Sequence, residues 1–217
     1  MICIDILGVK KAFRTQVVLD GIDLHLTGGN IYGVVGRNGS GKSVLMKCIC
    51  GLLPVSEGEI RMNGQKISPG KPLPEFVGAI IESPGFLPYL SGFANLKSLN
   101  ALRRSLSDPQ IREKMEEIGL DSHSRKSVRK YSLGMKQKLG ILQATMEDQK
   151  ILLLDEPMNG LDAAGVETVR ALLMRKKAEG KLILIATHVQ EDVNLLCDEV
   201  YRIENGQIRA IKKQTLA

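Results

Sequence analysis

The chain has 217 residues, 43% of them hydrophobic, so it is long enough to bury one sizeable core. With 30 lysines and arginines against 24 aspartates and glutamates, the formal net charge of +6 falls short of the charge density of a dedicated nucleic-acid binder. No apolar run approaches the roughly 18 to 20 residues that span a bilayer, so any membrane work is expected to need a separate chain.

The first segments of the chain alternate apolar and polar residues between glycine-bearing turns, which predicts a small antiparallel sheet. These segments are ICIDILGV, VVLDGIDLHL and GEIRMNGQKI. The run IYGVV at 31–35 is apolar throughout and predicts a buried strand, followed by a helix over 43–53. A short apolar strand is predicted at 76–81.

From about Ser91 to Met146 the pattern becomes helical. Within it, SDPQIREKMEEIGL offers Ser107 or Asp108 as an N-cap, Pro109 near the first helical position and Gly119 as a stop. This part of the sequence predicts an inserted helical lobe.

Strands and helices alternate again after the lobe. KILLLDEP and KLILIAT predict buried strands, with helices over about 163–178 and from about Gln190. The tail EVYRIENGQIRAIKK, at 199–213, predicts two strands joined at Asn205-Gly206. The whole pattern predicts an α/β fold with a mostly parallel sheet.

The cysteines show no metal-binding or redox spacing. They are Cys3, Cys48, Cys50 and Cys197, and nothing like a secretory signal precedes them. We therefore expect reduced thiols in a cytosolic protein.

The loop GRNGSGKS at 36–43 has the P-loop pattern Gly-x-x-x-x-Gly-Lys-Ser between a buried strand and a helix. Its glycines let backbone N–H groups converge on phosphate oxygens, and the helix dipole favours the negative charge. Lys42 is expected to reach the β- and γ-phosphates of a nucleotide and Ser43 to offer its hydroxyl to Mg²⁺. The expected phosphate-binding residues are Gly36, Asn38, Gly39, Ser40, Gly41, Lys42 and Ser43.

A P-loop site needs an acidic residue at the end of a second buried strand, and ILLLDEP supplies Asp155 and Glu156 there. Asp155 is the expected partner of Mg²⁺, through water. Glu156 is the candidate general base that polarises the attacking water. Capping of the next loop is the weaker alternative for Glu156.

A second phosphate-binding end is predicted in YSLGMKQKLGILQATM at 131–146, where Ser-x-Gly stands at the start of a helix. It offers a hydroxyl and free N–H groups but no lysine. One chain then holds halves of two different sites.

In their order and spacing these segments resemble the ATP-binding subunits of ABC transporters, over essentially the whole chain. GRNGSGKS resembles the Walker A loop, ILLLDEP the Walker B strand, YSLGM the LSGGQ signature and NGLD at 159–162 the D-loop. His188 in IATHV is similar to the switch histidine. Phe13 stands where the family places an aromatic that stacks on adenine, although packing in the core is an alternative for it.

The resemblance implies a P-loop NTPase core with a flanking antiparallel subdomain and an inserted helical subdomain, roughly residues 84–146 of a single domain at 1–217. It implies that two such domains pair head to tail around ATP, and a homodimer is favoured because one chain holds every element of a full site. Ser132 and Gly134 are then expected to contact the γ-phosphate bound by the partner. His188 is expected to hold that phosphate and the attacking water, and Asp162 to serve the dimer contact while capping the helix from Ala163.

Two positions depart from the family pattern. The signature keeps only Ser132 and Gly134, so the contacts of the family's terminal glutamine do not carry over to Met135. In IIESPGFLPYLSGFANL, Glu82 stands where the family has glutamine, and its extra charge near Asp155 makes it a candidate ligand of Mg²⁺. This segment is similar to the exporters that protect bacteria from bacitracin and lantibiotic peptides.

The resemblance therefore implies an ATPase subunit on the inner face of the cell membrane. It would power a separate integral-membrane permease, contacted around 86–90, for export of a drug or antimicrobial peptide. A soluble ABC ATPase acting on ribosomes or DNA is the alternative. The basic run RKSVRK at 125–130 lacks interleaved aromatics, so a solvated face is favoured there and no nucleic-acid partner is expected.

Overall fold

The computed structural model describes residues 2–74 and 76–211. An antiparallel sheet forms early in the chain, as the alternating pattern predicts, with its strands in the order β2-β1-β4-β5. Its strands are β1 (Cys3–Phe13), β2 (Gln16–Thr27), β4 (Glu57–Met62) and β5 (Gln65–Lys66).

The second sheet forms the centre of the α/β core and has the order β10-β9-β3-β8-β7-β6. Pairing is parallel from β9 to β6, and only the β10–β9 hairpin is antiparallel. The bounds are β3 (Ile31–Val35), β6 (Val77–Ile80), β7 (Ile151–Asp155), β8 (Leu182–Ala186), β9 (Glu199–Glu204) and β10 (Gln207–Ile211).

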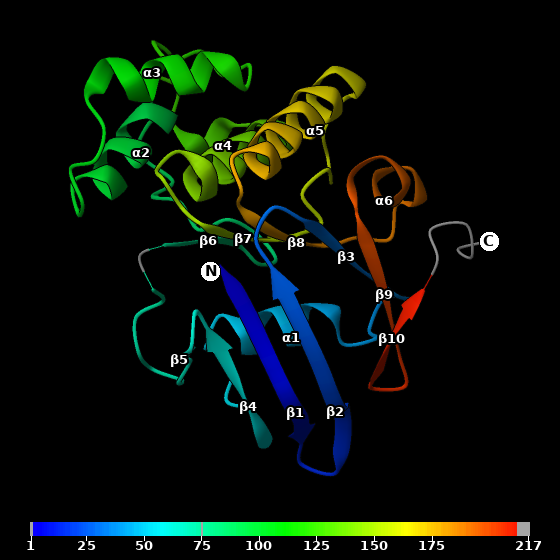
Figure 1. Ribbon diagram of the computed structural model, residues 1–217. Coiled ribbons are helices and arrows are strands. Elements are labelled where there is room, and N and C mark those ends of the chain that lie inside the picture. Colours follow the sequence, from blue (N-terminus) through cyan, green and yellow to red (C-terminus); the bar gives the residue numbers. More distant parts are fainter. Residues whose placement is uncertain (1, 75, 212–217) are drawn as a thin grey trace.

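The three central strands β3, β7 and β8 are buried on both faces, which is why their sequences read as continuous apolar runs. Leu152 and Leu154 point to the face covered by the helices, whereas Ile151 and Leu153 point to the opposite face. On that opposite face, helix α1 (Lys42–Ile49) packs between the two sheets (Figure 1). The P-loop is thus anchored at both ends by buried elements.

The helical lobe lies between β6 and β7 in the chain. Its elements are α2 (Gly92–Asn100), α3 (Asp108–Glu117), a 3-10 turn (Val128–Lys130) and α4 (Leu133–Thr145). Ser107, rather than Asp108, caps α3, and its N–H donates to Gln110 Oε1 at 2.8 Å. The lobe packs into the same apolar cluster as one face of the core sheet. Its division from the core at 84–146 stays a prediction.

The last helices are α5 (Ala163–Ala178) and α6 (Gln190–Leu196). The hairpin turns at Asn205 and Gly206, both at positive φ. Lys212 and Lys213 of its predicted second strand lie outside the described residues. The helix after the P-loop is shorter than predicted: it ends at Ile49, because Gly51 adopts a left-handed conformation with φ of 67°.

The described cysteines are free thiols. Burial raises the pKa of Cys48 to about 11 and that of Cys50 to about 12, which suits inert packing positions on and after α1. Within residues 2–74 and 76–211, no helix is long and apolar enough to cross a bilayer.

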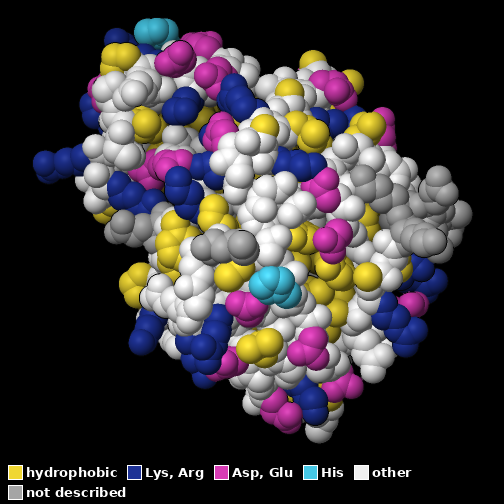
Figure 2. All heavy atoms as spheres, in the orientation of Figure 1, with side chains coloured by type: hydrophobic (Ala, Val, Ile, Leu, Met, Phe, Trp, Pro, Cys, Tyr) yellow, Lys and Arg dark blue, Asp and Glu magenta, His cyan; other side chains and the backbone are white. Residues whose placement is uncertain are grey.

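The basic run at 125–130 forms part of the solvated surface, as predicted. Arg125, Lys126, Arg129 and Lys130 are exposed, whereas Val128 between them is buried. Figure 2 shows one face of the molecule, on which acidic and basic side chains are interspersed. On this face the charges do not form a continuous basic groove.

Candidate active site

The P-loop takes its shape from glycines at its two ends. Gly41 is the N-cap of α1 with φ of 106°, a conformation that other residues rarely adopt. At the start of the loop, a Cβ on Gly36 would lie 2.6 Å from the carbonyl oxygen of Ile203 on β9. The loop can therefore lie against the sheet only with glycine at this position.

Lys42 is the first residue of α1, and its ammonium turns back over the loop. Its Nζ donates to the carbonyl oxygens of Gly36 at 2.7 Å and Arg37 at 3.2 Å. An ammonium has three donors, so one remains for a phosphate oxygen. The buried hydroxyl of Ser40 has no hydrogen-bond partner among the described residues. Both groups fit a loop that binds an anion.

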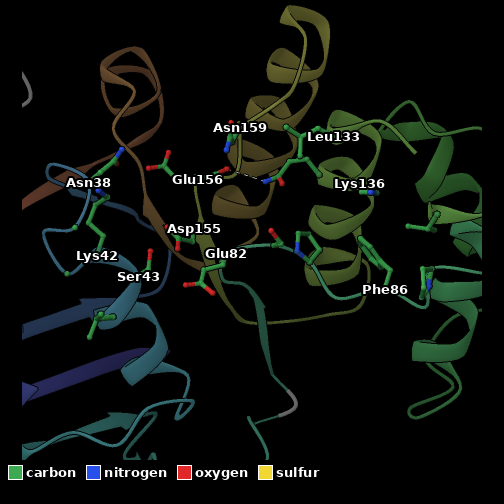
Figure 3. Close-up of a pocket in the computed structure, with 18 of the residues that line it drawn as sticks. Asn38, Lys42, Ser43, Glu82, Phe86, Leu133, Lys136, Asp155, Glu156 and Asn159 are labelled. Carbon is green, nitrogen blue, oxygen red and sulfur yellow. Dashed lines mark hydrogen bonds between the residues drawn. The ribbon is translucent and has the colours of Figure 1, made fainter. Parts of the chain in front are cut away.

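A cleft of about 860 Å³ lies between the P-loop and the helical lobe. Figure 3 shows Asn38, Lys42 and Ser43 on one side of it and Leu133, Lys136 and Phe86 on the other. It brings together these predicted site residues: Asn38, Gly39, Gly41, Lys42, Ser43, Glu82, Asp155 and Glu156. A second cavity, of about 900 Å³, joins Gly36 and Ser40 to His188.

Asp155 ends strand β7 and is buried, with 5% of its surface exposed. Among the described residues no cation pairs with its carboxylate. Burying a carboxylate without a cation is costly. No cluster of three metal-ligating side chains occurs in the described part of the chain. This sparse set of Ser43 and Asp155 oxygens fits Mg²⁺, which binds through one or two protein oxygens, substrate phosphates and water.

Glu156 and His188, both expected to act in catalysis, lie in direct contact. The ring Nδ1 of His188 is 2.8 Å from Glu156 Oε1. His188 follows β8, and the N–H of Glu156 donates to Ala186 O at the end of that strand at 2.8 Å. The parallel pairing of β7 with β8 therefore brings together two residues that are far apart in the sequence.

Glu82 follows β6 and carries a left-handed backbone with φ of 61°. Its carboxylate lines the cleft but binds Lys47 of α1, with 2.6 Å between Oε1 and Nζ. The structure thus supplies a cationic partner that sequence reasoning did not foresee. Any role of Glu82 as a metal ligand requires the carboxylate to be shared with or released from Lys47.

The signature residues stand at the start of α4. Ser132 is the N-cap and its Oγ accepts from Met135 N at 3.2 Å. A Cβ on Gly134 would lie 2.7 Å from Gly160 O, so the helix start packs closely on the D-loop segment of the same chain. Asp162 caps α5, as predicted, and its Oδ1 accepts from Gly165 N at 2.9 Å.

Phe13 lies at the end of β1, before the turn into β2. Phe13 is 44% exposed, so core packing does not account for it. The ammonium of Lys11 lies 4.8 Å from the ring centroid, which leaves a cation–π contact on the aromatic face. Phe13 does not itself line either cavity, although Gln16, Val17 and Val18 nearby line the second one.

Sequence reasoning missed three residues around the cleft. Lys47 binds Glu82, Gln137 of α4 donates to the carbonyl groups of Glu156 and Pro157, and Asn159 lines the cleft. Asn159 lies in the segment recognised as the D-loop, which could have marked it. Lys47 and Gln137 sit in ordinary helical patterns, and no sequence signal distinguishes them.

A P-loop, an acidic strand end beside it and a histidine in contact with the adjoining carboxylate define a P-loop nucleoside triphosphatase. Comparison of the sequence with protein families matches residues 19–159 to the ABC transporter family. The chain therefore belongs to the ATP-binding proteins of ABC transporters, whose shared activity is ATP hydrolysis.

Relatives share nearly the whole length of the chain. It is 38% identical to the ABC transporter ATP-binding protein YybJ of Bacillus subtilis strain 168, over 97% of this chain and 96% of that protein. It is 37% identical to the bacitracin transport ATP-binding protein BcrA of Enterococcus faecalis, over 93% of this chain and 66% of that protein. The lantibiotic transport ATP-binding protein SrtF of Streptococcus pyogenes is 33% identical, over 93% of this chain and 86% of SrtF.

Solved structures give the same assignment of the fold. The ATP-binding subunit of an ABC transporter superimposes with a TM-score of 0.85 at 26% identity, over 95% of this chain and 88% of that one. The ATP-binding cassette MJ1267 in its ADP conformation superimposes with a TM-score of 0.82 at 22% identity, over 100% of this chain and 93% of that one. The predicted P-loop core, mostly parallel sheet, antiparallel subdomain and helices are thereby confirmed.

Proposed function

We propose that this ATP-binding subunit hydrolyses MgATP in a head-to-tail dimer and thereby powers a separate membrane permease that exports a drug or antimicrobial peptide. The observation that carries the catalytic part is the 2.8 Å contact between Glu156 and His188 at the P-loop cleft. The contact supports a catalytic role for both residues, because Glu156 directly follows Asp155 at the end of β7 and lines the cleft with Lys42.

The assigned roles follow from this contact. Lys42, with one free donor, binds the β- and γ-phosphates, and the loop N–H groups around Gly39 and Gly41 bind the remaining phosphate oxygens. Glu156 accepts the proton of the attacking water as general base. His188 orients the Glu156 carboxylate through their hydrogen bond and holds the γ-phosphate.

Ser43 and Asp155 would hold Mg²⁺, Asp155 through water, and Glu82 is a further ligand if it leaves Lys47. When bound, the ion would neutralise charge on the β- and γ-phosphates. The buried, unpaired carboxylate of Asp155 supports this assignment.

Dimerisation is proposed because one chain carries a P-loop and a separate helix start, at Ser132 and Gly134, that offers donors without a lysine. In a head-to-tail pair, this helix start would contact the γ-phosphate held by the partner's P-loop. Asp162 would contribute to the same interface.

A permease contact is proposed at 86–90, where the chain enters the helical lobe. Leu87 is 44% and Tyr89 is 73% exposed, and a groove of about 610 Å³ lined by Ser83 and Pro84 adjoins this segment. Exposed apolar side chains beside a groove are typical of interaction sites. The names of BcrA and SrtF support a peptide antibiotic as the cargo. Binding to the permease would hold this chain at the inner face of the membrane.

The test is a pull-down of the tagged chain, in mild detergent, from membranes of its native host. A multi-spanning protein retained in stoichiometric amount is expected. Tyr89→Ala should weaken its retention, whereas Leu195→Ala, at an exposed apolar residue on α6, should not. Retention of ribosomal or DNA-bound proteins without any multi-spanning partner would contradict the transport role and favour a soluble ABC ATPase.

A further inference from the structure

Glu156 has an unusual backbone for a residue with a side chain. Its φ of 48° is in the left-handed region, which costs energy and persists only where the surroundings hold it. On one side its N–H donates to Ala186 O at 2.8 Å. On the other, its carbonyl oxygen accepts from Asn159 N at 3.1 Å and from the side chain of Gln137 at 3.2 Å (dashed near Glu156 in Figure 3).

Both hydrogen bonds of the Gln137 amide nitrogen go to this turn. Gln137 is 7% exposed, and its Nε2 donates to Pro157 O at 3.1 Å as well as to Glu156 O. The two hydrogens of one amide group thus serve two consecutive carbonyl groups. Burying an amide without such partners would be costly, so these bonds fix α4 relative to the turn.

A second close contact joins the same two elements. Gly134, one helical turn before Gln137, packs so closely on Gly160 that any Cβ would lie 2.7 Å from its carbonyl oxygen. Residues three apart share a helix face, so Gly134 and Gln137 present one side of α4 to the segment 156–160. The start of α4, with Ser132, is therefore fixed against the turn that carries Glu156 by both packing and hydrogen bonds.

We propose that Gln137 is a positioning residue for Glu156: it holds the backbone of the general base and ties it to the signature end of the same chain. This inference rests on the proposed role of Glu156. It adds that when Ser132 contacts the partner's nucleotide, Gln137 couples this contact to the position of the chain's own Glu156. In this proposal Gln137 acts through the backbone of Glu156 and not on the nucleotide directly.

The main test is Gln137→Met, which keeps an unbranched side chain and removes the donor. The turnover number for ATP should fall tenfold or more, while KM and the Kd for ATP change less than about threefold. Gln149→Met is the matched control, since Gln149 is also buried, at 5% exposure, and lines neither cavity of the site. In the Glu156→Gln background, Gln137→Met should cause no further loss, because residues acting as a unit are not additive.

Two further readouts separate positioning from a loss of structure. Amide hydrogen exchange of the peptide over 156–160 should accelerate in Gln137→Met without nucleotide, and not in Gln149→Met. Gln137→Glu keeps the shape but places a carboxylate against two carbonyl groups, so its turnover should fall at least as far as that of Gln137→Met.

The proposal is overturned if Gln137→Met lowers turnover by the same factor in the Glu156→Gln background as in the parent, or if it changes only KM. It is also overturned if the Gln137→Met chain fails to fold while Gln149→Met folds. Parental turnover in Glu156→Gln is a different failure, because that result would contradict the proposed role of Glu156 as general base.

Discussion

Glu82 and Lys47 form an ion pair beside the P-loop cleft, with 2.6 Å between Glu82 Oε1 and Lys47 Nζ. Lys47 lies on α1, five residues after Lys42 of the P-loop, and Glu82 begins the segment that leads into the helical lobe. The pair therefore links the helix that follows the P-loop to the segment that enters the lobe. Because the Glu82 side chain is 59% exposed, we expect it to contribute no more than about 1 kcal/mol to stability.

Replacing Glu82 with glutamine should affect coupling more than binding. The amide keeps the length of the side chain but cannot form the ion pair, so the Kd for ATP should change less than about threefold while transport by the assembled complex changes more. ATP binding is measured on the purified chain, and transport as resistance of the host to the exported compound. Glu57→Gln, which removes a similarly exposed ion pair with Lys10 on the antiparallel sheet, is the control. Unchanged transport and ATPase activity in Glu82→Gln would show that the carboxylate is incidental.

Replacing Glu156 with glutamine should stop hydrolysis and trap the dimer. The amide cannot accept the proton of the attacking water, and loss of a general base typically costs about 10²–10⁴-fold in rate. ATP should then remain bound, and size-exclusion chromatography with ATP should show a dimer that the parent forms only transiently. Glu113→Gln on α3, an exposed glutamate, is the control. Parental turnover in Glu156→Gln would exclude it as the base.

The main features of this site could be predicted because they are local. The glycines around Lys42 and the apolar strands before Gly36 and Glu156 determine the loop and its setting within short stretches of sequence. The contact of Glu156 with His188 was foreseeable because both residues follow buried parallel strands, whose carboxyl ends lie at one edge of the sheet.

Contacts between helices and loops could not be predicted in this way. Lys47 and Glu82 are 35 positions apart and Gln137 and Glu156 are 19 apart, and their meeting depends on how α1 and α4 pack on the sheet. Both cleft glutamates also adopt positive φ, which no propensity predicts for a side chain of this size. The extent of α1 was overestimated because the apolar run continues beyond its left-handed stop at Gly51.

Replacing Phe13 with alanine should weaken ATP binding by about 1–3 kcal/mol, the usual contribution of stacking a base on an aromatic ring, which is roughly 5- to 150-fold in Kd. Phe13, which ends β1 and is 44% exposed, is available for such stacking. Binding of inorganic tripolyphosphate should be unchanged, because it has no base. Phe13→Trp should restore ATP affinity. Equal losses for ATP and tripolyphosphate in Phe13→Ala would contradict a stacking role.

Asp148, on the loop between α4 and β7, pairs with Lys150 and Lys181 and should stabilise the fold above about pH 5. Its carboxylate accepts from Lys150 and from Lys181, which lower its pKa to about 2, and Lys181 is only 3% exposed. Because the Asp148 side chain is 73% exposed, solvent screens both pairs, so we expect Asp148→Asn to lower the free energy of unfolding by no more than about 1 kcal/mol at pH 7.

The pH dependence of this loss has a definite sign. The pKa of Asp148 is lower in the folded chain than the roughly 3.9 of an unfolded aspartate, so the unfolded state takes up the proton first. The stabilisation is complete above about pH 5 and is lost as the pH falls towards 2. Urea unfolding of the parent and Asp148→Asn should therefore give a difference that is constant from pH 7 to 5 and narrows below pH 4, and that shrinks at high salt. Asp20→Asn, at an exposed aspartate without an ion pair among the described residues, should show no such difference. A difference that widens on acidification would contradict the pairing of Asp148 with Lys181.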